Sequence, residues 1–531
     1  MNVLYGSRRF HMRWVGYISL AFTVTTSAVD WPQWRGPSGN GLVADSVPLL
    51  SAFPKDGLER LWTSEHIPSN DDGGHGTVVV VGNRVYMGIV WHSDMPSEKR
   101  ELNELVLRKL GYRNLDSSPM LVQKMEKARM GLSPRLRGEK LSQWIDKWVE
   151  ENLDKFQKER HASWIGSRFK KGRLAMPYSE LRRLGMKSGH VFPSDRAFRK
   201  WLDDEDFTDL VKQQVIKVVP SSIRVAKDVV ICIDATTGKT LWKTEAPGMP
   251  TGRRSSSTPC VADGRILSAG STHAHCLDAI TGKQLWATEL PGKGTASSFL
   301  VAKGMAFIMA GKLIAFDVKT GKEVWRSGEI SASSSSPVLW ESGGKQFLIV
   351  NTRTNISCVN PNDGALLWTT PGGGDSTPAI NGNWMAVYCR DSKTGLAGYK
   401  ISATGAEQLW KIPLEARRTQ SSPVIYQGHV YLAGGDNQLC VEMASGKVKW
   451  WEKRQSTISS PLIVDGKIIA LEKKGSELVM LKASPEAHRE LAKSRVKAMW
   501  CPSPVVSNGR LFLRMGDHVN CYNLSAQLPL P

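Results

Sequence analysis

The chain of 531 residues lacks several features that would mark a membrane protein or a haem protein. Its longest apolar run, Trp14–Ala28, has about 15 residues, fewer than the roughly 20 that a helix needs to cross a bilayer. The haem-attachment pattern C-x-x-C-H does not occur, and no nucleic-acid-binding motif is recognisable. The first cysteine is Cys232, so we expect no lipid anchor on an N-terminal cysteine.

Residues 1–28 have the pattern of an export signal. Arg8, Arg9 and Arg13 precede the apolar run, and the small residues Thr26-Ser27-Ala28 end it. We expect cleavage after Ala28, a mature chain without a membrane span, and a location in the periplasm, in the cell envelope or outside the cell. The alternative is an uncleaved membrane anchor. The Arg8-Arg9 pair partly resembles a twin-arginine export signal.

The chain has a formal net charge of +20. Such an excess attracts anionic surfaces and polymers, without choosing among them. Because export makes nucleic acid the least expected of these ligands, we predict no specific nucleic-acid binding. An envelope protein or an anionic polymer is the expected partner.

A unit of about 42 residues repeats from Cys232 onward, a period typical of propeller blades. Each unit begins with Ser or Thr, usually before Pro, and continues with an apolar strand, a tight glycine turn and a second apolar strand. A third strand then ends at an acidic or amide residue, and a fourth strand carries a tryptophan. These tryptophans are Trp242, Trp286, Trp325, Trp368, Trp410 and Trp450.

The end of each unit resembles a known motif. Cys232–Trp242 reads CIDATTGKTLW and Ala315–Trp325 reads AFDVKTGKEVW. The pattern A-x-D-x-x-T-G-K-x-x-W resembles the tryptophan-docking motif of PQQ-like β-propellers, a family that includes quinoprotein alcohol dehydrogenases and the outer-membrane assembly lipoprotein BamB. Trp31–Pro37, WPQWRGP, also resembles the start of many exported bacterial members.

Counting the turns between first and second strands gives eight units. We therefore predict an all-β fold, an eight-bladed β-propeller of four-stranded blades over 29–531 with a mainly helical insertion in the first blade. The last unit lacks a fourth strand, and we predict that Leu58–Trp62 supplies it to the blade of Trp500–Leu524, removing exposed sheet edges. The turns are at Gly82-Asn83, Asp263-Gly264, Gly304, Gly343-Gly344, Asn381-Gly382, Gln427-Gly428, Asp465-Gly466 and Asn508-Gly509.

Eight cysteines in an exported chain could form disulfides. Five of them occupy one position in the third strand of five units, where other units have Ala315 or Gly398. A position that accepts only small residues is tightly packed, so the pattern favours free, buried thiols. The five are Cys232, Cys276, Cys358, Cys440 and Cys521.

Residues 93–227 replace a short turn between the second and third strands of the first unit. The segment holds 29 Lys and Arg against 19 Asp and Glu, so it carries about half of the excess charge. It is either a solvated decoration or a lid or partner-docking module. We expect it on the face of the loops that join one unit to the next. The helices predicted from apolar spacing are Glu98–Leu110, Pro119–Met130, Glu139–Arg160, Ser194–Leu202 and Asp206–Val219.

The loops from the fourth strand of one unit to the first strand of the next carry candidate ligand-binding groups around the channel mouth. Converging guanidinium groups can bind carboxylate, sulfate or phosphate, and ordinary solvated loop charges are the alternative. The basic candidates are Arg253, Arg254, Lys293, Arg417, Arg418 and Arg454. Asp71, Asp72, His75 and Asp375 could join the same mouth. His92, His273 and His275 are a poor metal signal, and we predict no metal site.

By the family resemblance, a quinone dehydrogenase would need vicinal cysteines, acidic and amide ligands for calcium or a lanthanide, and a catalytic Asp. No two cysteines are adjacent here, and no acidic residue lies in a recognisable enzyme motif. We therefore predict no cofactor, disfavour PQQ with calcium, and assign no catalytic residue. The expected function is a monomeric, non-catalytic envelope scaffold. The alternative is an enzyme at the channel mouth, a divergent PQQ-dependent dehydrogenase or a hydrolase.

Overall fold

The computed structural model describes residues 29–67, 74–113, 119–250, 256–291, 296–331, 334–415 and 421–526. The chain divides into two compact units. The second unit is Val90–Asp228 with the residues from Ala246 at the end of strand β8, and the first unit is the rest of the chain. We call them the propeller unit and the helical unit.

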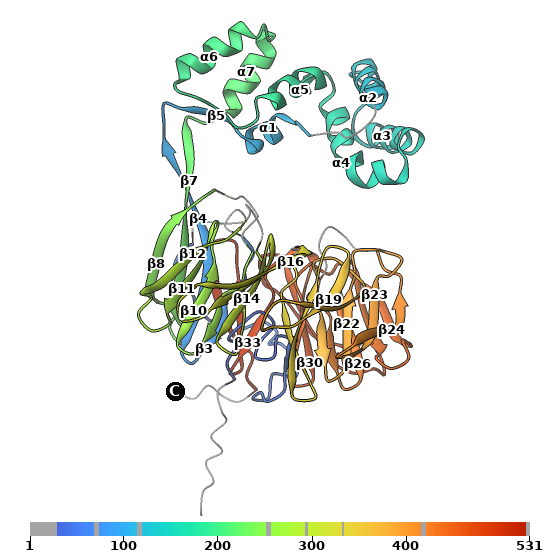
Figure 1. Cartoon of the computed structure of the whole chain (residues 1–531). Helices are drawn as coiled ribbons and strands as arrows, with labels where there is room; N and C mark the ends of the chain where they lie inside the picture. Colours follow the sequence, from blue (N-terminus) through green and yellow to red (C-terminus); the bar gives the residue numbers. More distant parts are fainter. Residues whose placement is uncertain are drawn as a thin grey trace, which may run out of the picture. The chain divides into compact units, whose positions relative to one another are not determined.

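Eight sheets of four or five strands make up most of the propeller unit (Figure 1). The first four sheets are β3 (Val79–Val81), β4 (Arg84–Pro96), β7 (Ser222–Asp234) and β8 (Thr240–Gly248); β9 (Cys260–Ala262), β10 (Arg265–Ala269), β11 (His273–Asp278) and β12 (Gln284–Glu289); β13 (Leu300–Ala302), β14 (Met305–Ala310), β15 (Lys312–Asp317) and β16 (Glu323–Ser331); β17 (Val338–Ser342), β18 (Lys345–Asn351), β19 (Asn355–Val359) and β20 (Leu366–Pro371). The next three are β21 (Ala379–Asn381), β22 (Trp384–Tyr388), β23 (Leu396–Ser402) and β24 (Gly405–Ile412); β25 (Val424–Tyr426), β26 (His429–Gly434), β27 (Asn437–Glu442) and β28 (Val448–Lys453); β29 (Leu462–Val464), β30 (Lys467–Glu472), β31 (Glu477–Lys482) and β32 (Glu490–Arg495).

The eighth sheet joins the two ends of the chain. It consists of β33 (Val505–Ser507), β34 (Arg510–Arg514), β35 (Val519–Asn523) and the N-terminal strand β2 (Arg60–Thr63). Strand β2 pairs antiparallel with β35, with Trp62 opposite Cys521. The predicted pairing of Leu58–Trp62 with the last sheet is confirmed. A further N-terminal strand, β1 (Leu42–Val43), pairs parallel with β29 and makes the seventh sheet five-stranded.

The turns between first and second strands follow the glycine positions in the sequence. In Asp263-Gly264 both residues have positive φ, the type I′ geometry that two-residue hairpins favour. The prediction of Asn381-Gly382 was wrong by one residue, because β21 extends to Asn381 and Gly382-Asn383 makes the turn. There only Gly382 has positive φ, as a type II′ turn requires.

Tryptophans of the fourth strands link neighbouring sheets. Trp286 donates its indole N–H to the carbonyl of Val318 at 2.9 Å, and Gly321 in the next sheet lies against the same indole ring. A Cβ at Gly321 would stand 2.4 Å from the Trp286 ring, so the turn needs glycine for space as well as for its positive φ. Trp62 forms the same contact between the last sheet and the first, donating to the carbonyl of Ala235 at 2.9 Å.

Apolar side chains between successive sheets form the core. One cluster contains Leu267 of the second sheet together with Ile308 and Phe316 of the third. The five predicted third-strand cysteines are completely buried, and all eight cysteines are free thiols, so the prediction of packed thiols is confirmed. Burial raises the pKa of the Cys276 thiol to about 11, which keeps it protonated and unreactive at neutral pH.

The described residues of the helical unit form seven α-helices and a small two-stranded sheet. The chain enters this unit from β4 and leaves it into β7. None of these helices is long and apolar enough to span a bilayer. The elements are β5 (Arg100–Leu102), α1 (Glu104–Leu110), α2 (Pro119–Gly131), α3 (Gly138–Asn152), α4 (Lys155–Lys171), η2 (Gly172–Leu174), α5 (Tyr178–Met186), β6 (His190–Phe192), α6 (Asp195–Asp204) and α7 (Asp209–Val218).

Two helix predictions for this unit were wrong. The predicted helix Glu98–Leu110 begins as strand β5, because Asn103 caps α1 by accepting hydrogen bonds from the N–H groups of Leu105 and Val106. The predicted helix Glu139–Arg160 is two helices, since Asp154 forms a capping box with Gln157 and starts α4. Helix α5 and the β5–β6 pair were not predicted from the sequence.

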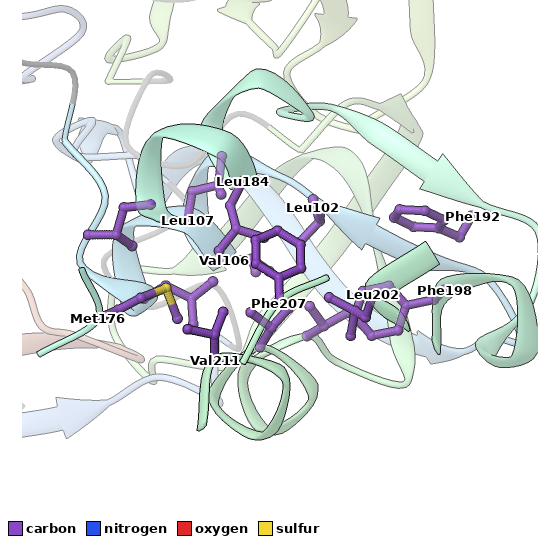
Figure 2. Close-up of a cluster of buried hydrophobic side chains, with 14 of the residues drawn as sticks. Leu102, Val106, Leu107, Met176, Leu184, Phe192, Phe198, Leu202, Phe207 and Val211 are labelled. Atoms are coloured by element: carbon purple, nitrogen blue, oxygen red, sulfur yellow. The ribbon is translucent and has the colours of Figure 1, made fainter. Parts of the chain in front are cut away.

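One core holds β5, β6 and helices α1, α5, α6 and α7 together. Figure 2 shows Leu184 of α5 and Val211 of α7 in this cluster, with Leu102 from β5 and Phe192 from β6. A second core packs α2, α3 and α4 around Phe169, whose ring lies 4.9 Å from that of Trp148. The helical unit therefore has its own buried interior.

Candidate functional site

A closed ring of hydrogen bonds connects the starts of the eight first strands. In each, the backbone N–H of a buried Ser or Thr donates to the hydroxyl of the corresponding residue in the next sheet, at 2.8 to 3.1 Å. The members in order are Thr77, Thr258, Ser298, Ser336, Thr377, Ser422, Ser460 and Ser503, and Ser503 donates back to Thr77. The ring satisfies buried backbone donors that no strand pairing reaches. It also links each of the eight sheets to the next one.

The N-terminal segment, residues 31–50, runs along the inner strands of this ring. Trp31 exchanges backbone hydrogen bonds with Val80 of β3, and the carbonyl of Pro32 accepts from Val261 of β9. The indole N–H of Trp34 donates to the hydroxyl of Thr377, a ring member, at 3.2 Å. In Figure 1 this segment, in blue, lies among the sheets drawn in orange and red.

The later part of the N-terminal segment contacts the last three sheets. Arg35 donates to the carbonyl of Pro423, just before β25. Strand β1 pairs with β29, and Leu50 donates to the carbonyl of Leu524 at 2.8 Å. The segment therefore bonds to six of the eight sheets or to the residues that start them.

A cavity of about 370 Å³ opens beside the segment at the two remaining sheets, the third and fourth. One wall is formed by Gln33, Trp34 and Pro37–Gly39, and the opposite wall by the first strands β13 and β17 with the residues before them. Its size falls within the range of ligand pockets, and the aromatic and aliphatic side chains of Trp34, Phe299 and Val338 contribute to its walls. It can take an apolar side chain or a small ligand.

Most of the predicted mouth residues lie outside the described part of the chain. These are Arg253, Arg254, Lys293, Arg417, Arg418, Asp71 and Asp72. The structure describes His75, Asp375 and Arg454. Whether the mouth residues converge, and whether the helical unit shares their face, stays a prediction.

Arg454 is engaged by two carboxylates. Its guanidinium donates to both oxygens of Glu472, at 2.8 and 3.0 Å, and to Glu490 at 2.7 Å. Glu472 is 2% exposed, and hydrogen bonding to it raises the pKa of Arg454. A buried carboxylate needs such a partner, so Arg454 has a structural task that competes with binding an external anion.

The carboxylate of Glu472 is part of a larger polar network. Gln438 donates to it at 2.7 Å, and the side-chain carbonyl of Gln438 lies 2.8 Å from Nε2 of His488. Burial, and then the charge of Arg454, lower the pKa of His488, so this imidazole is neutral at pH 7. The network joins the sixth sheet to the seventh.

The other two described candidates also have partners within the fold. Asp375 accepts a hydrogen bond from Arg390 at 2.8 Å, in an ion pair between groups near the start of the fifth sheet. The imidazole of His75 lies 5.9 Å from the ring of Trp500, and its backbone N–H donates to Ser256. His273 and His275 lie 6.0 Å apart between ring centres. Within the described ranges, no group of three or more His, Cys, Asp or Glu could hold a metal ion.

The model of the family described as outer membrane protein assembly factor BamB matches residues 226–411 and 392–488. BamB of Yersinia pestis is 25% identical over 318 residues, which cover 55% of this chain and 67% of that protein. The chain belongs to the PQQ-like repeat propeller family. This confirms the family resemblance of the repeated motif.

A second curated relative of this PQQ-like propeller is the tetrathionate hydrolase of Acidithiobacillus ferrooxidans, 26% identical over 187 residues. The match covers 30% of this chain and 37% of that enzyme. Among solved structures, BamB from Moraxella catarrhalis is 16% identical with a TM-score of 0.46, covering 57% of this chain and 90% of that one. Quinohemoprotein alcohol dehydrogenase ADHIIG from Pseudomonas putida is 13% identical with a TM-score of 0.41, covering 58% and 74%.

The hydroxyl ring of this PQQ-like propeller, and the N-terminal segment beside it, were not predicted from the sequence. The residues before each proline were interpreted as markers of strand starts, although six of them, Thr258, Ser336, Thr377, Ser422, Ser460 and Ser503, are members of the hydroxyl ring. Trp31–Pro37 was interpreted as a family marker only. A signal for this role was present in the sequence. The cluster Trp31, Trp34 and Arg35 lies before the first repeat unit and belongs to none of its strands, so these large side chains must pack elsewhere in the fold.

Proposed function

We propose that this chain is an exported, eight-bladed PQQ-like propeller that works as a non-catalytic scaffold and binds a protein of the cell envelope. The eight sheets and the closed hydroxyl ring support the blade number. The helical unit is the proposed insertion for docking. The relative from Yersinia pestis is named an outer membrane protein assembly factor, which supports a partner of the same class.

The observation that carries this proposal is the exposed apolar surface of the helical unit. Large apolar side chains there are about half to three-quarters exposed, among them Met120 at 76%, Leu174 at 73% and Met186 at 75%. Methionine is flexible and polarisable, so exposed methionines suit adaptable protein contacts. We call Met95, Met120, Met130, Leu174, Met186, Val191 and Leu210 the exposed apolar set.

Part of this set is held in place by the fold. Gln214 lies one helical turn after Leu210 on α7, and its side-chain amide donates to the carbonyl of Leu174 at 3.3 Å. Leu174 follows α4 through η2, and Arg129 of α2 donates to the carbonyl of Gly172 in that same turn at 2.6 Å. Leu174 and Leu210 are therefore presented by ordered, interlocked elements, which lowers the entropy cost of binding.

The propeller channel gives further support to a scaffold. Its inner strands bond to the chain's own N-terminal segment, and the buried ring hydroxyls accept from their neighbours. These polar groups serve the fold first. An anionic polymer bound through the net charge of the chain is compatible with the same role.

The experiment compares two variants of the full chain in binding to envelope proteins. One changes Met120, Leu174, Met186 and Leu210 to Ser. The matched control changes four exposed apolar residues of the fourth strands, Leu241, Leu285, Val324 and Leu367, to Ser. If the helical unit docks the partner, crosslinking to a specific envelope protein is lost in the first variant and kept in the control. Equal crosslinking by both variants contradicts the proposal.

A second candidate function is hydrolysis at the channel mouth, which the partial match to tetrathionate hydrolase favours. It is tested directly, by incubating the purified chain with tetrathionate and measuring its consumption. A dye-linked alcohol oxidation assay with PQQ and calcium tests the dehydrogenase alternative. Turnover in either assay, abolished by heat denaturation, would replace the scaffold proposal.

A further inference from the structure

Arg35 is a buried cation without a carboxylate partner among the described residues. Arg35 is 3% exposed and lies deep among the first strands. Burial lowers the pKa of its guanidinium to about 9, so it is still protonated at neutral pH. Burying an unpaired charge is costly, and proteins usually offset that cost with an opposite charge.

Among the described residues, only one of the three guanidinium nitrogens of Arg35 has a hydrogen-bond partner. Nη2 donates to the carbonyl of Asn40 at 2.7 Å and to the carbonyl of Pro423. Nε and Nη1 are buried and have no hydrogen-bond partner within the described ranges. Two nitrogens of a charged group, with three N–H donors between them, therefore remain for a ligand.

Arg35 lines a small cavity. The space in which a water molecule can be centred there is about 10 Å³. This is room for a single water or a monatomic ion. Its lining combines the N-terminal segment with the starts of three first strands. The lining residues are Trp31, Trp34, Arg35, Gly41, Thr77, Ser460, Pro461, Leu462, Ser503 and Pro504.

The side chains around this cavity offer hydrogen-bond donors. Besides Arg35, the indole N–H of Trp31 is buried and has no partner in the described part of the chain. The hydroxyls of Thr77, Ser460 and Ser503 each accept a ring hydrogen bond, which leaves their own hydrogens available to donate. The lining contains no carboxylate. A donor-rich site around a cation selects an anion.

We propose that this cavity binds one monatomic anion of the size of chloride, held by Arg35, Trp31 and the ring hydroxyls. The small volume favours a monatomic ion over phosphate or sulfate. The bound ion neutralises Arg35 and connects the N-terminal segment to the hydroxyl ring at Thr77, Ser460 and Ser503. None of the lining residues belongs to the exposed apolar set or to the predicted mouth arginines.

The test measures chloride binding to the full chain by ³⁵Cl NMR line broadening and by thermal unfolding. At constant ionic strength, replacing gluconate with chloride should raise the melting temperature with the logarithm of chloride concentration, as for any ligand of the native state. Bromide should replace chloride. Arg35→Met should remove both the line broadening and the chloride dependence.

Two further variants keep the test decisive. Arg129→Met removes another buried arginine, one paired with Glu126, and should leave chloride binding unchanged. If Arg35→Met does not fold, Trp31→Phe removes only one donor and should weaken chloride binding several-fold. Line broadening that is equal in the parent, Arg35→Met and Trp31→Phe would show that the cavity holds water only, and the proposal would fall.

Discussion

The propeller unit and the helical unit satisfy their buried polar groups in opposite ways. In the propeller unit one hydrogen bond, from backbone N–H to a Ser or Thr hydroxyl, is repeated eight times around a ring. In the helical unit a single carboxylate, Glu126, accepts from two buried arginines, at 2.6 Å from Arg129 and 2.7 Å from Arg168. In the propeller unit the loss of one such hydrogen bond leaves seven equivalent ones in place. In the helical unit both buried arginines depend on the same carboxylate, that of Glu126.

The largest effect should come from breaking the closure of the propeller. Deleting residues 29–65 removes the N-terminal segment and β2, which exposes the edge of β35 and leaves the ring without Trp62. We expect a protein that aggregates or melts far below the parent, because an unpaired strand edge invites association. Size-exclusion chromatography and thermal unfolding measure this. A melting profile like that of the parent would mean that the ring closes in another way.

The next effect tests the single-residue dependence of the helical unit. Glu126→Gln leaves the side chains of Arg129 and Arg168, 1% and 4% exposed, without a carboxylate. Breaking a buried pair costs about 3–5 kcal/mol, so amide hydrogen exchange should accelerate in α2 and α4 and not in the sheets. Glu104→Gln, in an exposed pair with Arg108, is the matched control and should change nothing measurable. Exchange that rises equally in both units would contradict the prediction.

Glu126 also gives this unit a defined pH dependence. Burial alone would raise the pKa of its carboxyl, but the hydrogen bonds and charges of Arg129 and Arg168 outweigh burial and lower it. A carboxyl with a depressed pKa contributes its full stability above the pKa of the unfolded chain. That contribution is lost as the pH falls through the folded pKa. Acid should therefore loosen the helical unit of the parent, and Glu126→Gln should lack this step.

A smaller effect separates backbone strain from packing in the tryptophan contacts. Gly304 and Gly321 both have φ near +70°, but a Cβ at Gly304 meets nothing within 4 Å, whereas one at Gly321 meets Trp286 at 2.4 Å. Gly304→Ala should cost about 1 kcal/mol of unfolding free energy from the left-handed backbone. Gly321→Ala should cost about 1–3 kcal/mol more from overpacking. Urea unfolding compares the two, and equal losses would show that the indole moves aside freely.

The smallest expected effect concerns the channel mouth. Changing Arg253, Arg254, Arg417 and Arg418 to Ser should weaken binding of heparin at low salt and matter less at moderate salt, because screening reduces the attraction. Arg454→Ser should instead lower stability, since it leaves Glu472 buried without its guanidinium. Heparin affinity is compared with that of the parent. Equal binding by the four-arginine variant would leave the charge of the helical unit as the source of polyanion affinity.

The repeated parts of the fold could be predicted from the sequence because each signal occurs many times. Glycine turns, tryptophans and third-strand cysteines each marked the same position in unit after unit, and the unpaired Leu58–Trp62 could only complete the last sheet. Single features were missed. Asn103 and Asp154 are ordinary cap residues that end one element and start another, and a spacing of apolar residues does not reveal them. Likewise, nothing local to Arg35 says that the starts of β25, β29 and β33, far along the chain, lie beside it.

Pairing of β2 with β35 has a consequence for the time that folding takes. Arg60 pairs with Tyr522, so β2, one of the first strands to be synthesised, must wait for β35, the last strand. At synthesis rates of about 5–20 residues per second, that wait is roughly 20 to 90 s. During this interval the N-terminal segment has no completed ring around it. We therefore expect a chaperone that shields residues 31–63 until the C-terminal strands arrive to raise the yield of native protein.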